Sequence, residues 1–175
     1  MGRSTQTSLS CSGLAVLAIA ASTLGAAPVL AQTCESRWAT HLPTARTQAD
    51  MAFDSNRGRV VMFGGWDASV LKSDTWEYDG MSWRLVATTG PSARRGHKMV
   101  YDAIRRRTLL IGGVSAATPS QIETWAWDGA TWRLIDAAGP TYSFSASNVA
   151  TEMAVSYDLS RGRVVMVLAN GQTWE

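Results

Sequence analysis

Thr75-Trp-Glu-Tyr-Asp-Gly-Met-Ser-Trp-Arg-Leu85 occurs twice in this chain, returning 49 residues later as Thr124-Trp-Ala-Trp-Asp-Gly-Ala-Thr-Trp-Arg-Leu134. Each copy runs on to a Gly-Pro pair, at Gly90-Pro91 and Gly139-Pro140. Asp-Gly between aromatic and β-branched runs indicates a tight β-hairpin, because its turn needs residues that tolerate positive φ. A repeat of about 50 residues built from short strands is typical of a β-propeller blade.

The upstream half of the unit repeats as well. It reads aromatic-Asp-x-x-Arg-x-Arg and occurs three times, at 53–59, 101–107 and 157–163. In the first two copies it is preceded by Pro-x-Ala-Arg, ending at Arg46 and Arg94, and followed by an apolar run closed by paired glycines. The repeats therefore span 43–90 and 91–139, with an incomplete third one over 140–175.

Each complete repeat is expected to form four antiparallel strands. The first ends in aromatic-Asp, the second ends at the glycine pair, the third is Thr-Trp-x-aromatic and the fourth begins Trp-Arg-Leu. The third copy stops just inside its Thr173-Trp174 strand. A long helix between 50 and 175, or parallel pairing of the Val60 and Thr75 strands, would contradict this prediction.

At these residues the chain resembles the kelch repeat family. The paired glycines of that family are matched by Gly64-Gly65 and Gly112-Gly113. Its spaced aromatic pair is matched by Tyr78 with Trp83 and by Trp127 with Trp132. The resemblance covers about 43–175 and implies an all-β fold, a kelch-type β-propeller of which this chain holds a partial arc of about two and a half four-stranded blades. In the third copy Leu168-Ala169 replace the glycines and Asn170-Gly171 forms the next turn.

The first 31 residues are predicted to be a secretory signal peptide. Arg3 supplies the positive start, Gly13 to Ala27 the apolar region and Val29-Leu-Ala31 the cleavage site. A membrane anchor is the less favoured alternative, because the run is short and interrupted. We therefore expect a secreted protein, periplasmic or extracellular. Only Cys34 would remain after cleavage, as an unpaired thiol or, less favoured, in an intermolecular bridge.

Length and charge limit the possible functions. The mature chain of about 144 residues is too short for a closed propeller, which typically has about 4 to 8 blades. Segment 32–42, with Trp38, resembles the outer strand of a missing blade. We therefore expect a fragment of a longer product or an incomplete gene, and a multimer that closes the ring is the alternative. The net charge of +2, about +1 without Arg3, argues against nucleic-acid binding.

The variable loops are the predicted binding surface, since short repeated turns lie on one face of such a scaffold and loops of varied length on the other. Candidate contact residues there are Trp66, Asp67, Lys72, Arg94, Arg95, Tyr142 and Phe144. A second set is expected to be structural and recurs in register: Gly64, Gly65, Gly112, Gly113, Trp76, Trp83, Trp125, Trp132, Asp54, Asp102 and Asp158. The aspartates are expected to cap turns, and His97 to pack rather than to catalyse.

Two functions of different classes follow. The favoured one is a secreted binding module for a protein or a glycan, without a cofactor or a metal ion. The other is a fragment of a galactose-oxidase-like or other carbohydrate-active propeller enzyme. That oxidase chemistry needs a copper site of Tyr and His with a Cys crosslinked to a Tyr, and the resemblance places none of these residues in this chain. Its catalytic residues would therefore lie outside it.

Overall fold

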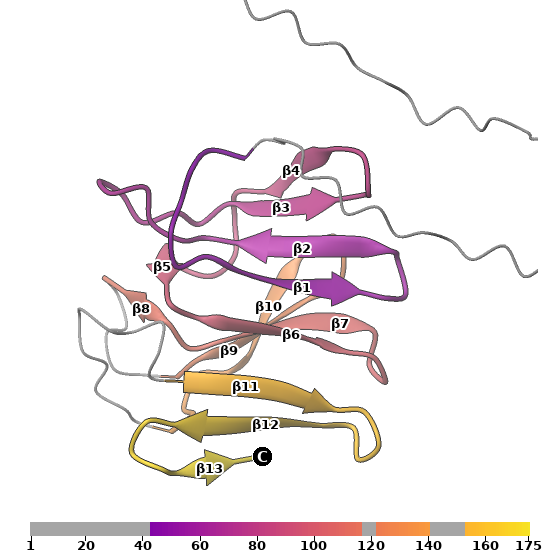
Figure 1. Ribbon diagram of the computed structural model, residues 1–175, viewed down its shortest axis with the longest axis vertical. Helices are drawn as coiled ribbons and strands as arrows, with labels where there is room; N and C mark the ends of the chain where they lie inside the picture. Colours follow the sequence, from indigo (N-terminus) through magenta and orange to yellow (C-terminus); the bar gives the residue numbers. More distant parts are fainter. Residues whose placement is uncertain (1–42, 117–121, 141–152) are drawn as a thin grey trace, which may run out of the picture. The chain divides into compact units, whose positions relative to one another are not determined.

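The computed structural model describes residues 43–116, 122–140 and 153–175, and in these ranges all regular structure is β-strand (Figure 1). The strands pair antiparallel throughout. The expected all-β class is therefore confirmed. Within the same ranges no helix has the length and apolar character needed to cross a bilayer. The predicted signal peptide and segment 32–42 lie outside the described residues.

The first two sheets are four-stranded meanders in which sequential strands are neighbours. In the first sheet Phe63 faces Thr75, so the strands that begin near Val60 and at Thr75 pair antiparallel as predicted. The first sheet consists of β1 (Asp50–Asp54), β2 (Arg59–Phe63), β3 (Thr75–Tyr78) and β4 (Trp83–Ala87). The second consists of β6 (Lys98–Asp102), β7 (Arg107–Ile111), β9 (Thr124–Trp127) and β10 (Trp132–Asp136).

The third sheet has three strands, β11 (Met153–Asp158), β12 (Arg163–Leu168) and β13 (Thr173–Trp174). The turn between β12 and β13 is tight: the amide of Gly171 donates to the carbonyl of Leu168, and the amide of Leu168 to that of Gln172, both at 2.9 Å. Gly171 adopts φ of 84°, which a glycine accepts without strain. The hairpin expected at Asn170-Gly171 therefore forms.

A two-stranded sheet was not anticipated from the sequence. It pairs β5 (Arg94–Arg95) with β8 (Val114–Ser115), with Arg94 opposite Ser115 and Arg95 opposite Val114. Strands of two residues carry no alternation that a sequence pattern could reveal. This small sheet matters because it fixes the loops of the first and second sheets.

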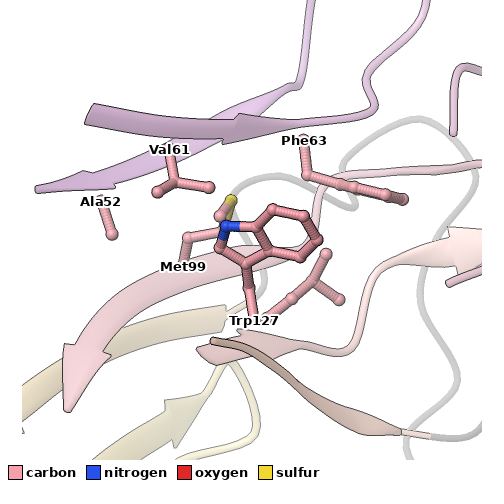
Figure 2. Close-up of a cluster of buried hydrophobic side chains, with 6 residues drawn as sticks. Ala52, Val61, Phe63, Met99 and Trp127 are labelled. Carbon is pink, nitrogen blue, oxygen red and sulfur yellow. The ribbon is translucent and has the colours of Figure 1, made fainter. Parts of the chain in front are cut away.

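Apolar side chains fill the space between successive sheets. Ala52, Val61 and Phe63 of the first sheet meet Met99, Leu110 and Trp127 of the second (Figure 2). A second cluster joins Ile111 and Ile122 to Met153, Met166 and Leu168 of the third sheet. The successive residues Leu110 and Ile111 of β7 enter different clusters, because successive side chains of a strand point to opposite faces.

Polar contacts cross the same two interfaces. The indole N–H of Trp127 donates to Glu77 Oε1 at 2.9 Å, and the hydroxyl of Tyr157 donates to Asp102 Oδ1 at 2.8 Å. Both acceptors belong to the preceding sheet in the chain. The sheets are thus joined in sequence order by apolar packing and by hydrogen bonds from aromatic side chains.

The repeated aspartates hold the short turns after β1, β6 and β11. Asp54 Oδ1 accepts the amides of Asn56 and Arg57, both at 3.0 Å, and its Oδ2 accepts Arg57 Nε at 2.7 Å. Asp102 and Asp158 make the corresponding contacts with the residues that follow them. Burial opposes ionisation of Asp54, but the hydrogen bonds from Arg57 outweigh it and lower its pKa. These side chains therefore cap turns. In the run 105–107, the first two arginines belong to one of those turns and the third begins β7.

Candidate binding surface

Three loops meet at one edge of the first two sheets. The loop between β2 and β3 is hydrogen-bonded to β5, since the amide of Gly65 donates to the carbonyl of Arg94 at 2.9 Å and the amide of Arg94 to that of Lys72 at 3.1 Å. The pairing of β5 with β8 adds the loop that follows β7. Four of the predicted contact residues, Trp66, Asp67, Lys72 and Arg95, therefore belong to one connected group of loops.

Trp66 and Arg95 form the centre of this surface. The guanidinium carbon of Arg95 lies 4.9 Å from the centroid of the Trp66 ring, which is cation–π geometry. Both side chains are half-buried. With Leu71, Val114, Ser115 and Ala116 they line a shallow hollow of about 310 Å³. A cation held against an aromatic ring beside apolar walls can receive a negatively charged group that carries an apolar neighbour.

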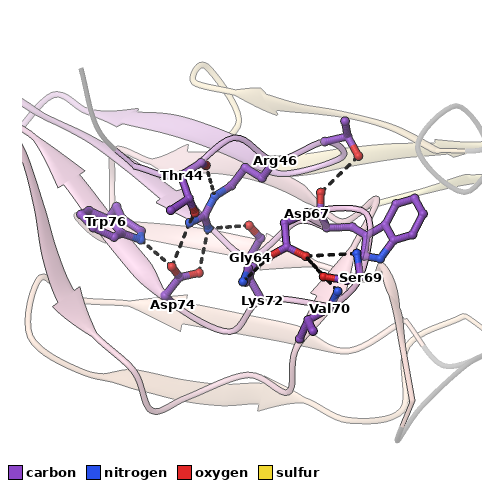
Figure 3. A network of polar contacts seen from close by, with 11 residues as sticks. Thr44, Arg46, Gly64, Asp67, Ser69, Val70, Lys72, Asp74 and Trp76 are labelled. Carbon is purple, nitrogen blue, oxygen red and sulfur yellow. Dashed lines mark hydrogen bonds and ion pairs between the residues drawn. The ribbon is translucent and has the colours of Figure 1, made fainter. Parts of the chain in front are cut away.

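Asp67 shapes the loop next to the hollow. Its Oδ1 accepts the amide of Val70 at 2.9 Å and the hydroxyl of Ser69 at 2.9 Å, and its Oδ2 pairs with Lys72 Nζ at 2.5 Å (Figure 3). The Lys72 ammonium and these hydrogen bonds hold the pKa of Asp67 well below its usual range. Asp67 and Lys72 therefore engage each other and define the shape of the loop.

Arg94 does not lie on this surface, contrary to the prediction. Its side chain is fully buried, with Nη1 donating to the carbonyl of Gly112 at 3.0 Å and Nη2 to Glu123 Oε2 at 2.5 Å. Its guanidinium satisfies the carbonyl that follows β7 and the carboxylate that precedes β9, two polar groups that would be costly to bury without a partner. A ligand approaching from solvent would not reach this guanidinium.

The same arrangement occurs one repeat earlier. Arg46 donates to the carbonyl of Gly64 at 2.9 Å and to both carboxylate oxygens of Asp74, and Trp76 Nε1 donates to Asp74 Oδ2 at 2.6 Å (Figure 3). In the second repeat Glu123 Oε2 accepts hydrogen bonds from Arg94 Nη2 and, at 3.0 Å, from Trp125 Nε1. We call this unit the arginine clamp: an arginine, a glycine carbonyl, a carboxylate and a tryptophan. Burial raises the pKa of each carboxyl, but the hydrogen bonds outweigh it, so both pKa values are lowered.

The paired glycines allow the clamp to form. Gly64 has φ of 59°, and a Cβ built on it would lie 2.7 Å from the carbonyl oxygen of Arg94. A Cβ on Gly113, with φ of 87°, would lie 2.8 Å from the Cβ of His97. Positive φ and close backbone approach both favour glycine here. Gly64 therefore lets the next repeat approach the end of β2, and Gly113 lets the entry segment of its own repeat approach the end of β7.

The remaining predicted residues are distributed as follows. Trp76 and Trp125 belong to the arginine clamps, Trp132 lies between the first and second sheets, and Trp83 stacks on Tyr78 within the first sheet, with ring centroids 5.3 Å apart. Tyr142 and Phe144 lie outside the described residues. Whether they border the hollow stays a prediction.

His97 is a buried neutral side chain directly before β6. It is 1% exposed and meets the Phe63 ring edge-on at 5.6 Å. Burial, together with the positive charges of Arg94 and Lys98, lowers the pKa of His97 to about 3. An uncharged imidazole at neutral pH fits the expected packing role. In the described parts of the chain no three His, Cys, Asp or Glu side chains gather as metal ligands.

A larger groove separates the second and third sheets. It has a volume of about 570 Å³ and is lined by, among others, Ile111, Thr124, Met166 and Trp174. Ile111 and Thr124 are the counterparts of Phe63 and Thr75, against which Trp132 of β10 packs in the preceding interface. The groove therefore corresponds to the position that a fourth strand occupies in the other sheets, which makes it a packing groove.

No protein-family model matches the chain. The fold and the site together define the class of this protein. It is an all-β protein of repeated antiparallel sheets, with an aromatic and cationic hollow where its longer loops meet.

Proposed function

We propose that this chain is part of a kelch-type β-propeller that acts as a secreted binding module, with the Trp66–Arg95 hollow as the contact site. The propeller assignment is supported by the sequence repeat and by successive antiparallel meanders packed face to face. The observation that carries the binding role is the guanidinium of Arg95 over the Trp66 ring, beside apolar walls. Ligand sites combine an apolar lining with a few placed polar groups in this way.

The chemistry of the lining favours an acidic ligand. Arg95 supplies a planar donor for a carboxylate, whereas Leu71, Val114 and Ala116 supply apolar area next to it. Two ligands meet this description: a glycan that carries a uronic or sialic acid, and a protein segment with an acidic residue beside an apolar one. The fold context fits either, since surface loops on a rigid scaffold commonly carry recognition.

The test uses the full chain, secreted from an expression host, on an array of acidic glycans and an array of acidic peptides. We expect binding to one of the two classes and at least a tenfold loss of affinity in both Arg95→Gln and Trp66→Ala. The matched control is Arg133→Gln, which removes an exposed arginine of β10 outside the hollow. Binding that resists Arg95→Gln, or that Arg133→Gln weakens equally, would contradict the proposal.

A further inference from the structure

The two ends of the sheet stack carry complementary halves of one repeating interface. The repeat places Met51, Met99 and Val155 at one equivalent position, and Phe63, Ile111 and Val167 at another. The first position faces the preceding sheet, because Met99 enters the cluster shared with the first sheet and Val155 the cluster shared with the second. The second position faces the following sheet, as Phe63 and Ile111 do.

The exposed fraction of the side chain at these positions depends on whether its sheet lies inside the stack or at one end. Met99 is 6% exposed, whereas its counterpart Met51 in the first sheet is 54% exposed. Ile111 is 4% exposed, whereas its counterpart Val167 in the third sheet is 42% exposed. Each end of the stack therefore presents an apolar face of the kind that the interior interfaces bury. We call the one with Met51 the first end face and the one with Val167 the second end face.

Polar groups at the two ends are also matched. Between the first and second sheets Trp132 Nε1 donates to Thr75 Oγ1 at 2.8 Å, and Thr75 is fully buried. The counterparts of these two residues are Trp83 on the first sheet and Thr173 on the third, where Thr173 is exposed. The end faces thus retain both the donor and the acceptor of the contact that joins the interior sheets.

A charged pair is repeated in the same way. Glu77 Oε1 pairs with Arg57 Nη1 at 2.7 Å and also accepts the hydrogen bond from the indole N–H of Trp127 in the next sheet. In the third sheet Glu175, the counterpart of Glu77, pairs with Arg161 Nη1 at 2.6 Å. The second end face therefore holds the acceptor group already positioned as it is inside the stack.

From this match we infer that two copies of the chain associate head to tail, the second end face of each copy packing on the first end face of the other. Such an interface joins different surfaces and closes into a ring when the rotation permits. The described residues of two copies would supply six such sheets, two of them three-stranded, and closed propellers have about 4 to 8 blades. Trp83 of one copy would then donate to Thr173 of the other. The inference rests on the propeller architecture proposed above and is independent of the hollow and its ligand.

The test measures the mass of the full chain in solution by light scattering after gel filtration. We expect a dimer in the wild type, and monomers in both Met51→Glu and Val167→Lys, because each buries an unpaired charge in both interfaces of the ring. The matched control is Val70→Asp, since Val70 is 56% exposed in the β2–β3 loop and lies on neither end face. It should leave the dimer intact.

Mixing the two variants distinguishes head-to-tail association from any other kind. A dimer of one Met51→Glu copy and one Val167→Lys copy has one interface without a substitution, so an equimolar mixture should dimerise although neither variant does alone. Circular dichroism of each variant confirms that it is folded. A monomeric wild type, open oligomers that grow with concentration, or a dimer that both end-face variants preserve would overturn the inference. If the wild type forms the dimer but binds neither acidic glycans nor acidic peptides, the result would contradict the proposed binding role of the hollow and leave the head-to-tail inference intact.

Discussion

Trp132 of β10 donates its indole N–H to the hydroxyl oxygen of Thr75 in β3, at 2.8 Å, across the interface between the second and first sheets. Its ring also meets Phe63 of β2 edge-on, with centroids 5.5 Å apart and planes at 73°. One side chain therefore joins the outer strand of one sheet to two strands of its neighbour. Trp132 also packs against Trp127 of its own sheet, as Trp83, at the equivalent place in the repeat, packs against Tyr78, but for Trp83 the structure gives no contact with a preceding sheet among the described residues.

This difference predicts unequal losses of stability in variants that the repeat alone would rank as equal. Trp132→Ala should cost about 3 kcal/mol, the lower end of the scale for deleting a large aromatic, because the ring is partly buried between the two sheets. Trp83→Ala should cost less than half of that, because its ring packs within one sheet. Urea melts in a Met51→Glu background, in which the proposed head-to-tail dimer should not form, measure both. Equal losses would show that the cross-sheet contacts of Trp132 contribute little.

The buried arginine clamp makes Arg94 a stability residue. Arg94→Ala should lower the free energy of unfolding by about 3 to 5 kcal/mol, because Glu123 and the Gly112 carbonyl would lose their partner in a buried place. Arg161→Ala is the control, since Arg161 pairs with the carboxylates of Asp158 and Glu175 but is half-exposed. It should leave chemical melts nearly unchanged. If the two variants lose the same free energy of unfolding, the buried contacts of Arg94 contribute no more to stability than the exposed ion pairs of Arg161.

His97 should make stability depend on pH above the acid range of the carboxylates. Its pKa is about 3 in the folded state and 6.5 in the unfolded chain, so between these values the unfolded state binds one more proton. Stability should therefore fall as the pH falls from about 6.5, by up to about 1.4 kcal/mol per pH unit. Urea melts between pH 7 and pH 5 test this. His97→Ala, which introduces the residue found at the equivalent position 49, should remove that slope.

Close backbone approach, in addition to positive φ, should determine the cost of replacing a glycine. Gly58→Ala adds a Cβ at φ of 64° with nothing within 4 Å, so it should cost about 1 to 2 kcal/mol. Gly113→Ala, at φ of 87°, places the Cβ 2.8 Å from His97 Cβ and 2.9 Å from the Arg95 carbonyl oxygen, and should cost at least twice as much. Thermal melts of both variants measure the difference, and equal losses would mean that the neighbouring segment moves away freely.

Local chemistry in the sequence determined the strands, the turns and their order. Period-2 apolar runs, Asp-Gly turns and the turn-capping Asp54, Asp102 and Asp158 act through residues close in the chain. Their effect is therefore legible in a single sequence, and the recurrence of each feature in register made the interpretation stronger. The meander order of the first two sheets follows from the same signals, because short connections join neighbouring antiparallel strands.

Only the tertiary structure decided which of the repeated or charged residues reach solvent. Arg94 and Arg95 are adjacent in the connection between the fourth strand of one repeat and the first strand of the next, and both were predicted to be surface cations. Folding brings Gly112 and Glu123 to Arg94, which is buried, and places Trp66 beside Arg95, which remains half-exposed over the hollow. These partners lie 18 to 29 residues away from the arginines in the chain. Burial depends on such distant groups, and neither composition nor local spacing encodes their positions.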